Sequence, residues 1–195
     1  MSEFLAESRV IDWRNPQVMA LANELYQCSS DRNEFVRRAF DWVRDEIFHT
    51  GDHGHKVVTC SASDVLKHRT GFCYAKSHLL VAICRAQGVP AGLGYQRLSI
   101  NGDGPPYCLH GFAAVELEGE GWRRLDPRGN NPGISTDFSI SHDCLAFTPV
   151  LEGESTFNEI LTEPHDTVVA ALTGATHASE LLQNLPDLAA LRPVS

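Results

Sequence analysis

The stretch from Arg69 to Ser77 constrains the fold of this chain most, because it delivers a cysteine, Cys73, to the start of an apolar helix. Gly71 supplies the preceding turn, and we expect the helix to end at Gly88. A thiol is a weak nucleophile until it ionises, and the positive end of a helix dipole stabilises the thiolate. Cys84 lies further along the same helix, among packed side chains. The position of Cys73 therefore makes it the candidate nucleophile.

The composition argues against several classes of protein. With 195 residues, of which 43% are hydrophobic, the chain is long enough to bury a core as one domain. Its net charge of -9 offers no basic patch for nucleic acid, and no stretch approaches the roughly 18 apolar residues of a membrane span. The first residues lack the basic and apolar regions of a secretory signal. The six cysteines form no Cys-x-x-Cys pair, so we expect reduced thiols and a cytoplasmic protein, and we leave its oligomeric state open.

Helical signals precede the cysteine helix. Capping residues followed by apolar residues at helical spacing predict helices over residues 16–26 and 32–47, and a serine cap predicts a short helix over residues 61–67. Residues 9–13 alternate between apolar and polar, which is typical of an edge strand or an N-terminal arm. We interpret these elements as scaffold.

The sequence after the helix predicts an antiparallel meander. Strand-like alternation covers residues 92–100, 107–117 and 122–126, with turn-forming residues between them. The predicted fold class is therefore α+β, with a central helix that carries the cysteine packed on an antiparallel sheet. Weaker patterns further on predict a strand over residues 143–148 and helices over residues 166–172 and 176–185. We expect these last elements to cover an exposed face of the sheet without contributing chemistry.

His110 and Asp126 fall on two neighbouring strands of this meander. A hairpin centred near Glu118 would set them directly opposite one another, so that the carboxylate could hold the imidazole. A tight two-residue turn would instead pair Ala113 with Asp126, so the direct pairing requires a looser turn or a bulge. A carboxylate in this place has the orienting role in a nucleophile, base and carboxylate triad.

These three residues carry a resemblance to the transglutaminase-like superfamily of papain-type thiol enzymes. The cysteine motif that opens the helix, the strand that begins His110-Gly-Phe-Ala-Ala-Val and the strand Trp-Arg-Arg-Leu-Asp126-Pro occur in that family's order and spacing. The resemblance covers about residues 35–130. It implies a transglutaminase-like core within a single domain over residues 1–195, preceded by a helical part over 1–34 and followed by a strand and helices over 131–195.

The resemblance also implies a function. Cys73 would be the nucleophile, His110 the general base and acid, and Asp126 the orienting carboxylate, with no cofactor. We expect a cysteine protease, amidase or transglutaminase-like acyltransferase that forms an acyl-enzyme thioester on a peptide or protein substrate. The Cys73 backbone amide is one expected oxyanion donor, and a second must come from residues 49–63.

Substrate contacts are less clearly marked in the sequence. Tyr74, which follows the cysteine, and Trp122 either line the substrate cleft or pack in the core. We predict both as substrate-binding residues, and we expect the loop over residues 48–63 to form a wall of the cleft.

Two alternatives remain open from sequence. The chain could be a catalytically silent member of the same family that binds a peptide or protein in its cleft. More remotely, the histidines of the loop and a nearby cysteine could hold a metal ion, although their spacing matches no common zinc pattern; these residues are His49, His53, His55 and Cys60.

Overall fold

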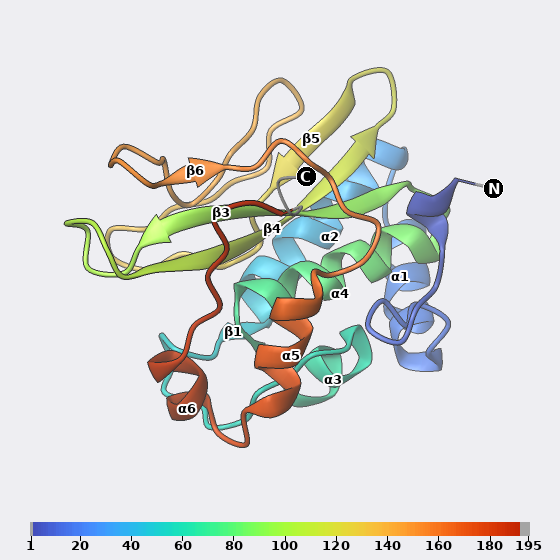
Figure 1. Cartoon of the computed structure of the whole chain (residues 1–195). Helices are drawn as coiled ribbons and strands as arrows, with labels where there is room; N and C mark the ends of the chain where they lie inside the picture. The colour runs from blue at the N-terminus through green and yellow to red at the C-terminus, as the bar shows by residue number, and fades with distance from the viewer. Residues whose placement is uncertain (1, 192–195) are drawn as a thin grey trace.

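The computed structural model describes residues 2–191 as a four-stranded sheet with helices gathered against it (Figure 1). The elements in chain order are the 3-10 turn η1 (Glu3–Leu5), α1 (Pro16–Gln27), α2 (Arg32–Glu46), β1 (Phe48–His49), α3 (Ala62–His68), β2 (Thr70–Gly71), α4 (Cys73–Ala86), β3 (Ala91–Ser99), β4 (Tyr107–Leu117), β5 (Gly121–Leu125), β6 (Ser155–Thr156), α5 (Asp166–Gly174) and α6 (Ala178–Gln183). No helix within residues 2–191 is long and apolar enough to cross a membrane.

The central helix and the antiparallel sheet confirm the predicted fold class. Strands β3, β4 and β5 follow one another along the chain as neighbours, and β6 joins the free edge of β3, which gives the order β5-β4-β3-β6. Helix α4 packs on this sheet and lies among α1, α2 and α3 (Figure 1). Every residue from Cys73 to Arg85 is buried, so α4 forms the centre of the molecule.

The predicted helix starts are confirmed by their caps. Asn15 accepts a hydrogen bond from the backbone at the start of α1, Asp31 caps α2 and Ser61 caps α3. Each side-chain oxygen satisfies an amide that the helix leaves unpaired. The residue before α4, Phe72, has no such oxygen, so the first amides of α4 carry no side-chain cap.

The interior consists of two apolar clusters. The larger cluster joins α1, α2, α3 and α4 to the inner face of the sheet. The smaller one surrounds Cys73 and Tyr74 and is closed by Val168 and Leu172 of α5 and by Leu181 of α6. The last two helices therefore build the surroundings of the cysteine, and the expectation that they merely cover an exposed face of the sheet was wrong.

The strand predicted over residues 143–148 is absent from the described residues, and of the two possibilities for residues 9–13, an edge strand or an N-terminal arm, the structure shows the arm. Residues 143–148 form an extended segment that makes a single bridge, between Leu125 and Cys144, and the strand that completes the sheet lies further on as β6. Residues 9–13 form an irregular arm whose Ile11 is fully buried. Periodicity cannot separate such buried, irregular segments from true strands, because both contain closely spaced apolar residues.

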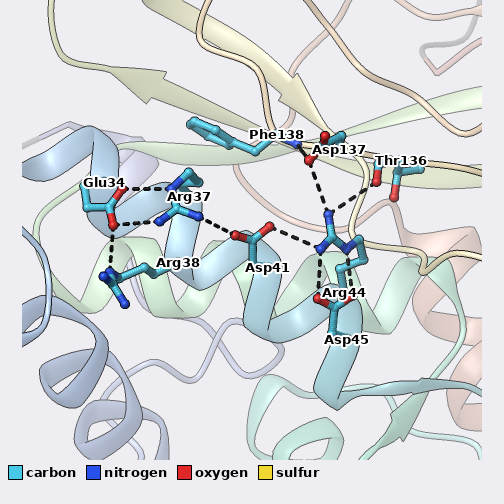
Figure 2. Close-up of polar contacts among 9 residues, drawn as sticks. All are labelled: Glu34, Arg37, Arg38, Asp41, Arg44, Asp45, Thr136, Asp137 and Phe138. Atoms are coloured by element: carbon cyan, nitrogen blue, oxygen red, sulfur yellow. Dashed lines mark hydrogen bonds and ion pairs between the residues drawn. The ribbon is translucent and has the colours of Figure 1, made fainter.

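A row of charged side chains follows the exposed face of α2 (Figure 2). Glu34, Arg37 and Asp41 pair at helical spacing, and Arg44 continues the row to Asp45. The row reaches the segment after β5, because the Arg44 guanidinium also donates to the Thr136 carbonyl and contacts Asp137 at 3.4 Å. Exposed pairs contribute little stability each, so the row mainly fastens this segment to α2.

Candidate active site

Cys73 is the first residue of α4, as predicted, and its side chain is only slightly exposed. The amide of Gly111 on β4 donates to the sulfur at 3.5 Å. This amide is available because β5 ends at Leu125, before it reaches the level of Gly111. An amide donor and an uncapped helix N-terminus both favour a negative charge on sulfur.

The structure brings His110 and Asp126 together. His110 Nε2 lies 2.6 Å from Asp126 Oδ2, and both side chains are buried. Because Nε2 faces the carboxylate, Nδ1 is the ring nitrogen left to serve the thiol of Cys73. The ring of Phe147 packs edge-on against the imidazole, with centroids 4.9 Å apart, and restricts its orientation.

The strand register that produces this contact differs from the prediction. β4 pairs with β5 through Ala113 and Leu125, so continuing the ladder by one residue sets Phe112, and not His110, opposite Asp126. The direct pairing was wrong, because the turn between the strands spans only residues 118–120. His110 lies two residues before Phe112 on the same face of the strand, and Asp126 therefore reaches it diagonally.

Asp126 is held as an anion by three donors. Oδ1 accepts the backbone amide of Arg128 at 3.1 Å, and Oδ2 accepts the amide of Ala146 at 2.9 Å in addition to His110. Burial raises the pKa of this carboxyl, but the charge and hydrogen bond of His110, together with the two amides, outweigh burial and hold the pKa below its usual range. Asp126 is therefore ionised at neutral pH.

The electrostatics of Cys73 and His110 favour an ion pair. Burial raises the pKa of the Cys73 thiol, but the charges and hydrogen bonds of His110 and then of His49 lower it below its ordinary value. Burial lowers the pKa of His110, and the charges of Asp126 and Cys73 reverse this and raise it. Both shifts favour the thiolate–imidazolium form of the pair over the neutral form.

His49 is the contributor to this site that sequence reasoning did not single out. The short strands β1 and β2 pair in parallel with His49 opposite Gly71, which places its imidazole beside Cys73. His49 Nδ1 lies 3.2 Å from Asp52 Oδ1, although the two atoms do not meet hydrogen-bond geometry. Asp52 is itself held by both terminal nitrogens of Arg128, at 2.8 and 2.9 Å.

A cavity of about 570 Å³ opens beside Cys73 and His110. Tyr74, one of the two predicted substrate-binding residues, lies in its inner wall, where its hydroxyl donates to the Leu109 carbonyl. His49 is the one lining residue from the loop over residues 48–63. Much of the remaining wall comes from segments after residue 127, which the sequence did not indicate.

Trp122 lies away from the cavity. It pairs with Glu116 on the β4–β5 hairpin, six residues along β4 from His110, which is about 20 Å of strand. Its ring packs against Phe4 with centroids 4.8 Å apart. The ring covers the N-terminal 3-10 turn, and Trp122 is not among the residues that line the cavity.

The proposed metal ligands of the loop do not converge. His49 lines the cavity beside the cysteine, whereas the rings of His53 and His55 pack at tilted angles against Phe48 and do not line it. The Cys60 carbonyl accepts a hydrogen bond from His78. Among residues 2–191, no three histidine, cysteine or acidic side chains come close enough to hold a metal ion.

Comparison with known protein families agrees with this geometry. The family model described as the transglutaminase-like superfamily matches residues 19–127, which is more than half of the chain and includes all three candidate residues. The chain belongs to the transglutaminase-like superfamily. This confirms the resemblance seen in the sequence. No curated protein sequence matches the chain.

A solved structure has the same fold over the transglutaminase-like core. A proposed cysteine protease from Cytophaga hutchinsonii is 23% identical with a TM-score of 0.51, over 64% of this chain and 40% of that chain. The periplasmic domain of TgpA from Pseudomonas aeruginosa is 25% identical with a TM-score of 0.46, over 64% of this chain and 45% of that chain. The chain thus spans less than half the length of either neighbour, and the likeness to the first concerns the fold alone.

Proposed function

We propose that this protein is a thiol-dependent acyl hydrolase or acyl transferase that acts on peptide or glutamine-type amide bonds through Cys73, His110 and Asp126. The observation that carries the proposal is the buried 2.6 Å contact of Asp126 with His110, next to a cysteine at an uncapped helix start. A buried carboxylate that orients an imidazole beside a thiol is the arrangement that activates a nucleophile.

Acylation begins from the thiolate of Cys73. The sulfur lone pair forms a bond to the carbonyl carbon of the substrate, and the carbonyl π electrons move to oxygen. When the tetrahedral intermediate collapses, the C–N bond breaks, and His110 gives its Nδ1 proton to the departing amine. The products are a free amine and a thioester on Cys73, while His110 is neutral and Asp126 stays ionised.

The second half-reaction returns the enzyme to its starting state. Water or a second amine attacks the thioester and gives a proton to His110, and the C–S bond breaks to regenerate the thiolate and the imidazolium. Water as acceptor makes the protein a protease or amidase. An amine as acceptor makes it a transglutaminase, and a peptide or protein is the proposed substrate in both cases.

The oxyanion of both steps needs two donors. The Cys73 amide is one, because it lies at the uncapped start of α4. We assign the second to the imidazole of His49, which lines the same cavity beside the sulfur. It belongs to the segment that the sequence indicated as the source of the second donor.

Alkylation with limiting iodoacetamide near neutral pH, located by mass spectrometry, tests the activated thiol. A Cys28→Ser background removes the exposed cysteine, so the four remaining thiols serve as internal references. Burial raises the pKa of Cys60 and Cys108 to about 11 and that of Cys84 to about 12. Cys73 should react at least about tenfold faster than these, since one pKa unit changes the thiolate fraction tenfold.

The same assay separates the enzyme from a binding module. In His110→Ala, alkylation of Cys73 should slow to the rate of the reference thiols. If all cysteines were labelled at the same rate in the protein whose candidate site is unchanged, the proposal would be overturned. A reactive Cys73 in a protein that neither cleaves peptides nor transfers glutamine acyl groups to added amines would favour the silent, peptide-binding alternative.

A further inference from the structure

The cavity beside Cys73 has an apolar wall that the family core does not supply. Nine of its twenty lining residues follow residue 127, where the family match ends. They include Phe147, Val150 and Leu151 from the segment before β6, and Leu182 and Leu185 from the C-terminal part. This wall is thus a feature of this chain's own C-terminal third.

The charged groups of the cavity are already compensated. Both oxygens of Glu154 accept backbone amides, from Ser99 at 2.9 Å and from Val150 and Leu151 at 2.9 and 3.0 Å. The terminal nitrogens of Arg128 are bound to Asp52. Apart from the candidate catalytic residues and His49, the lining residues that the structure describes therefore offer a charged substrate group no uncompensated partner, and its burial there would cost its full desolvation free energy.

Exposed apolar side chains gather at the rim of the same cavity. Of the eight large hydrophobic residues that are exposed within residues 2–191, three line it, and these are Ile100, Val150 and Leu182. Val150 is 81% exposed, and a contiguous exposed apolar patch of this kind marks a ligand-binding groove. The rim is nevertheless well fastened, because Glu154 ties the Val150 loop to the end of β3.

The C-terminal part of the wall is fastened in a similar way. The Leu109 amide donates to the Pro186 carbonyl at 2.7 Å, and Arg97 binds Asp187 with two contacts of 2.7 Å. These bonds hold the chain after α6 against β3 and β4. The apolar surface is thus a formed pocket of the size that ordinarily holds a small ligand, and it adjoins the candidate nucleophile.

We propose that this cavity is the acyl pocket of the enzyme and selects acyl donors that carry a large uncharged aliphatic or aromatic group beside the scissile carbonyl. The proposal rests on the proposed function, since it takes Cys73 as the acyl acceptor. The apolar group is buried among Leu151, Leu182 and Leu185, while the carbonyl faces Cys73 and the donors at the start of α4.

A series of iodoacetamides tests this selectivity without requiring turnover. The series compares iodoacetamide with reagents whose nitrogen carries an isobutyl, phenethyl, carboxyethyl or aminoethyl group, and each rate at Cys73 is divided by the rate of the same reagent with glutathione. The isobutyl and phenethyl reagents should label Cys73 at least about tenfold faster than iodoacetamide, and the charged reagents should gain nothing.

Two matched variants test whether the preference for apolar reagents depends on residues that line the cavity. Ile100 and Ile140 are the same residue type and are both 46% exposed, but only Ile100 lines the cavity. Ile100→Asp should reduce the preference for the apolar reagents several-fold, whereas Ile140→Asp should leave it unchanged. Leu182 is another exposed lining residue, and Leu182→Asp should behave like Ile100→Asp.

The outcomes separate this proposal from the proposed function. Cys73 that reacts rapidly with iodoacetamide but shows no preference for apolar reagents, or prefers charged ones, would overturn the acyl pocket and leave the thiol enzyme intact. An equal loss of preference in Ile100→Asp and Ile140→Asp would also overturn it. Slow labelling of Cys73 by every reagent would instead overturn the proposed function.

Discussion

Two imidazoles approach the sulfur of Cys73, and each has a carboxylate behind it. Asp126 contacts His110 at 2.6 Å and is fully buried, whereas Asp52 lies 3.2 Å from His49 without hydrogen-bond geometry and is shared with an arginine. The tight, buried contact fixes the charge and tautomer of His110, which a general base requires. The looser contact leaves His49 free to turn toward an oxyanion.

Asp126→Asn should raise the pH at which Cys73 becomes reactive. The carboxylate stabilises charged His110, and charged His110 lowers the pKa of Cys73, so a neutral amide weakens both effects. In a pH series of Cys73 alkylation, the midpoint should move by about one unit or more toward the ordinary thiol value of about 8.5. Asp137→Asn, at a side chain that is 81% exposed, is the control and should keep the original midpoint. If the original protein, Asp126→Asn and Asp137→Asn all had the same pH profile of Cys73 alkylation, the role proposed for Asp126 would be contradicted.

His49→Ala should separate acylation from alkylation. An oxyanion donor stabilises the tetrahedral intermediate of acyl transfer, but alkylation by iodoacetamide has no such intermediate. Acylation of Cys73 by an activated ester should fall about 100-fold or more, while alkylation slows far less and only through the weaker stabilisation of the thiolate. Equal losses in the two reactions would indicate that His49 acts only on the charge of Cys73.

At the level of elements, the sequence predicted those features that depend on residues close together in the chain. The caps Asn15, Asp31 and Ser61 act within one helical turn, so their signals are complete within a few residues. The pairing of β1 with β2 joins two-residue strands across more than twenty residues of chain, and two residues show no periodicity. For this reason the sequence named His49 only as a possible metal ligand within the donor segment, and not as a neighbour of Cys73. The register of β4 and β5 depended on a turn whose length the sequence left open.

The close approach of β4 to the start of α4 depends on a glycine. A Cβ atom at position 111 would lie 2.9 Å from Cδ1 and 3.2 Å from Cα of Tyr74, and the latter is backbone that cannot move aside cheaply. Gly111→Ala should therefore lower the free energy of unfolding by about 1–3 kcal/mol, as measured with urea, and slow Cys73 alkylation. Gly174→Ala is the control, because a Cβ there meets nothing within 4 Å and should not destabilise. Comparable stability of the two variants would show that β4 can shift without cost.

On the scale of the whole molecule, the C-terminal third closes the site that the family core begins. Phe147 contacts His110, the Ala146 amide contacts Asp126, and α5 and α6 complete the apolar cluster around Cys73. The sequence assigned no chemistry to these segments, since their patterns were weak and their partners lie 20 to about 100 residues earlier in the chain. The proposed nucleophile, base and carboxylate could be picked out in the sequence because short motifs carry them, whereas the wall of the cavity arises only from tertiary packing.

One buried side chain ties the distant parts of the chain together. Arg85, at the end of α4, donates from Nε and Nη2 to the Ala91 carbonyl at 3.0 and 2.8 Å. It also donates to the carbonyls of Ala6 at 2.6 Å and of Thr162 at 2.5 Å, which belong to the N-terminal arm and the segment before α5. A planar guanidinium can serve three carbonyls in different directions, and a lysine ammonium on its flexible stem cannot reproduce that fork.

Arg85→Met should therefore destabilise the whole molecule, because it leaves three carbonyls without their donor. We expect the free energy of unfolding to fall by about 3 kcal/mol in urea titration, and we expect Arg85→Lys to recover only a minor part of this loss. Arg14→Met is the matched control, since the Arg14 side chain is 61% exposed and its pair with Glu7 should contribute less than about 1 kcal/mol. If Arg85→Lys were as stable as the original protein, the charge and not the three-way fork would be what the position requires, and the arm, the sheet and the C-terminal segment would be held together by other contacts.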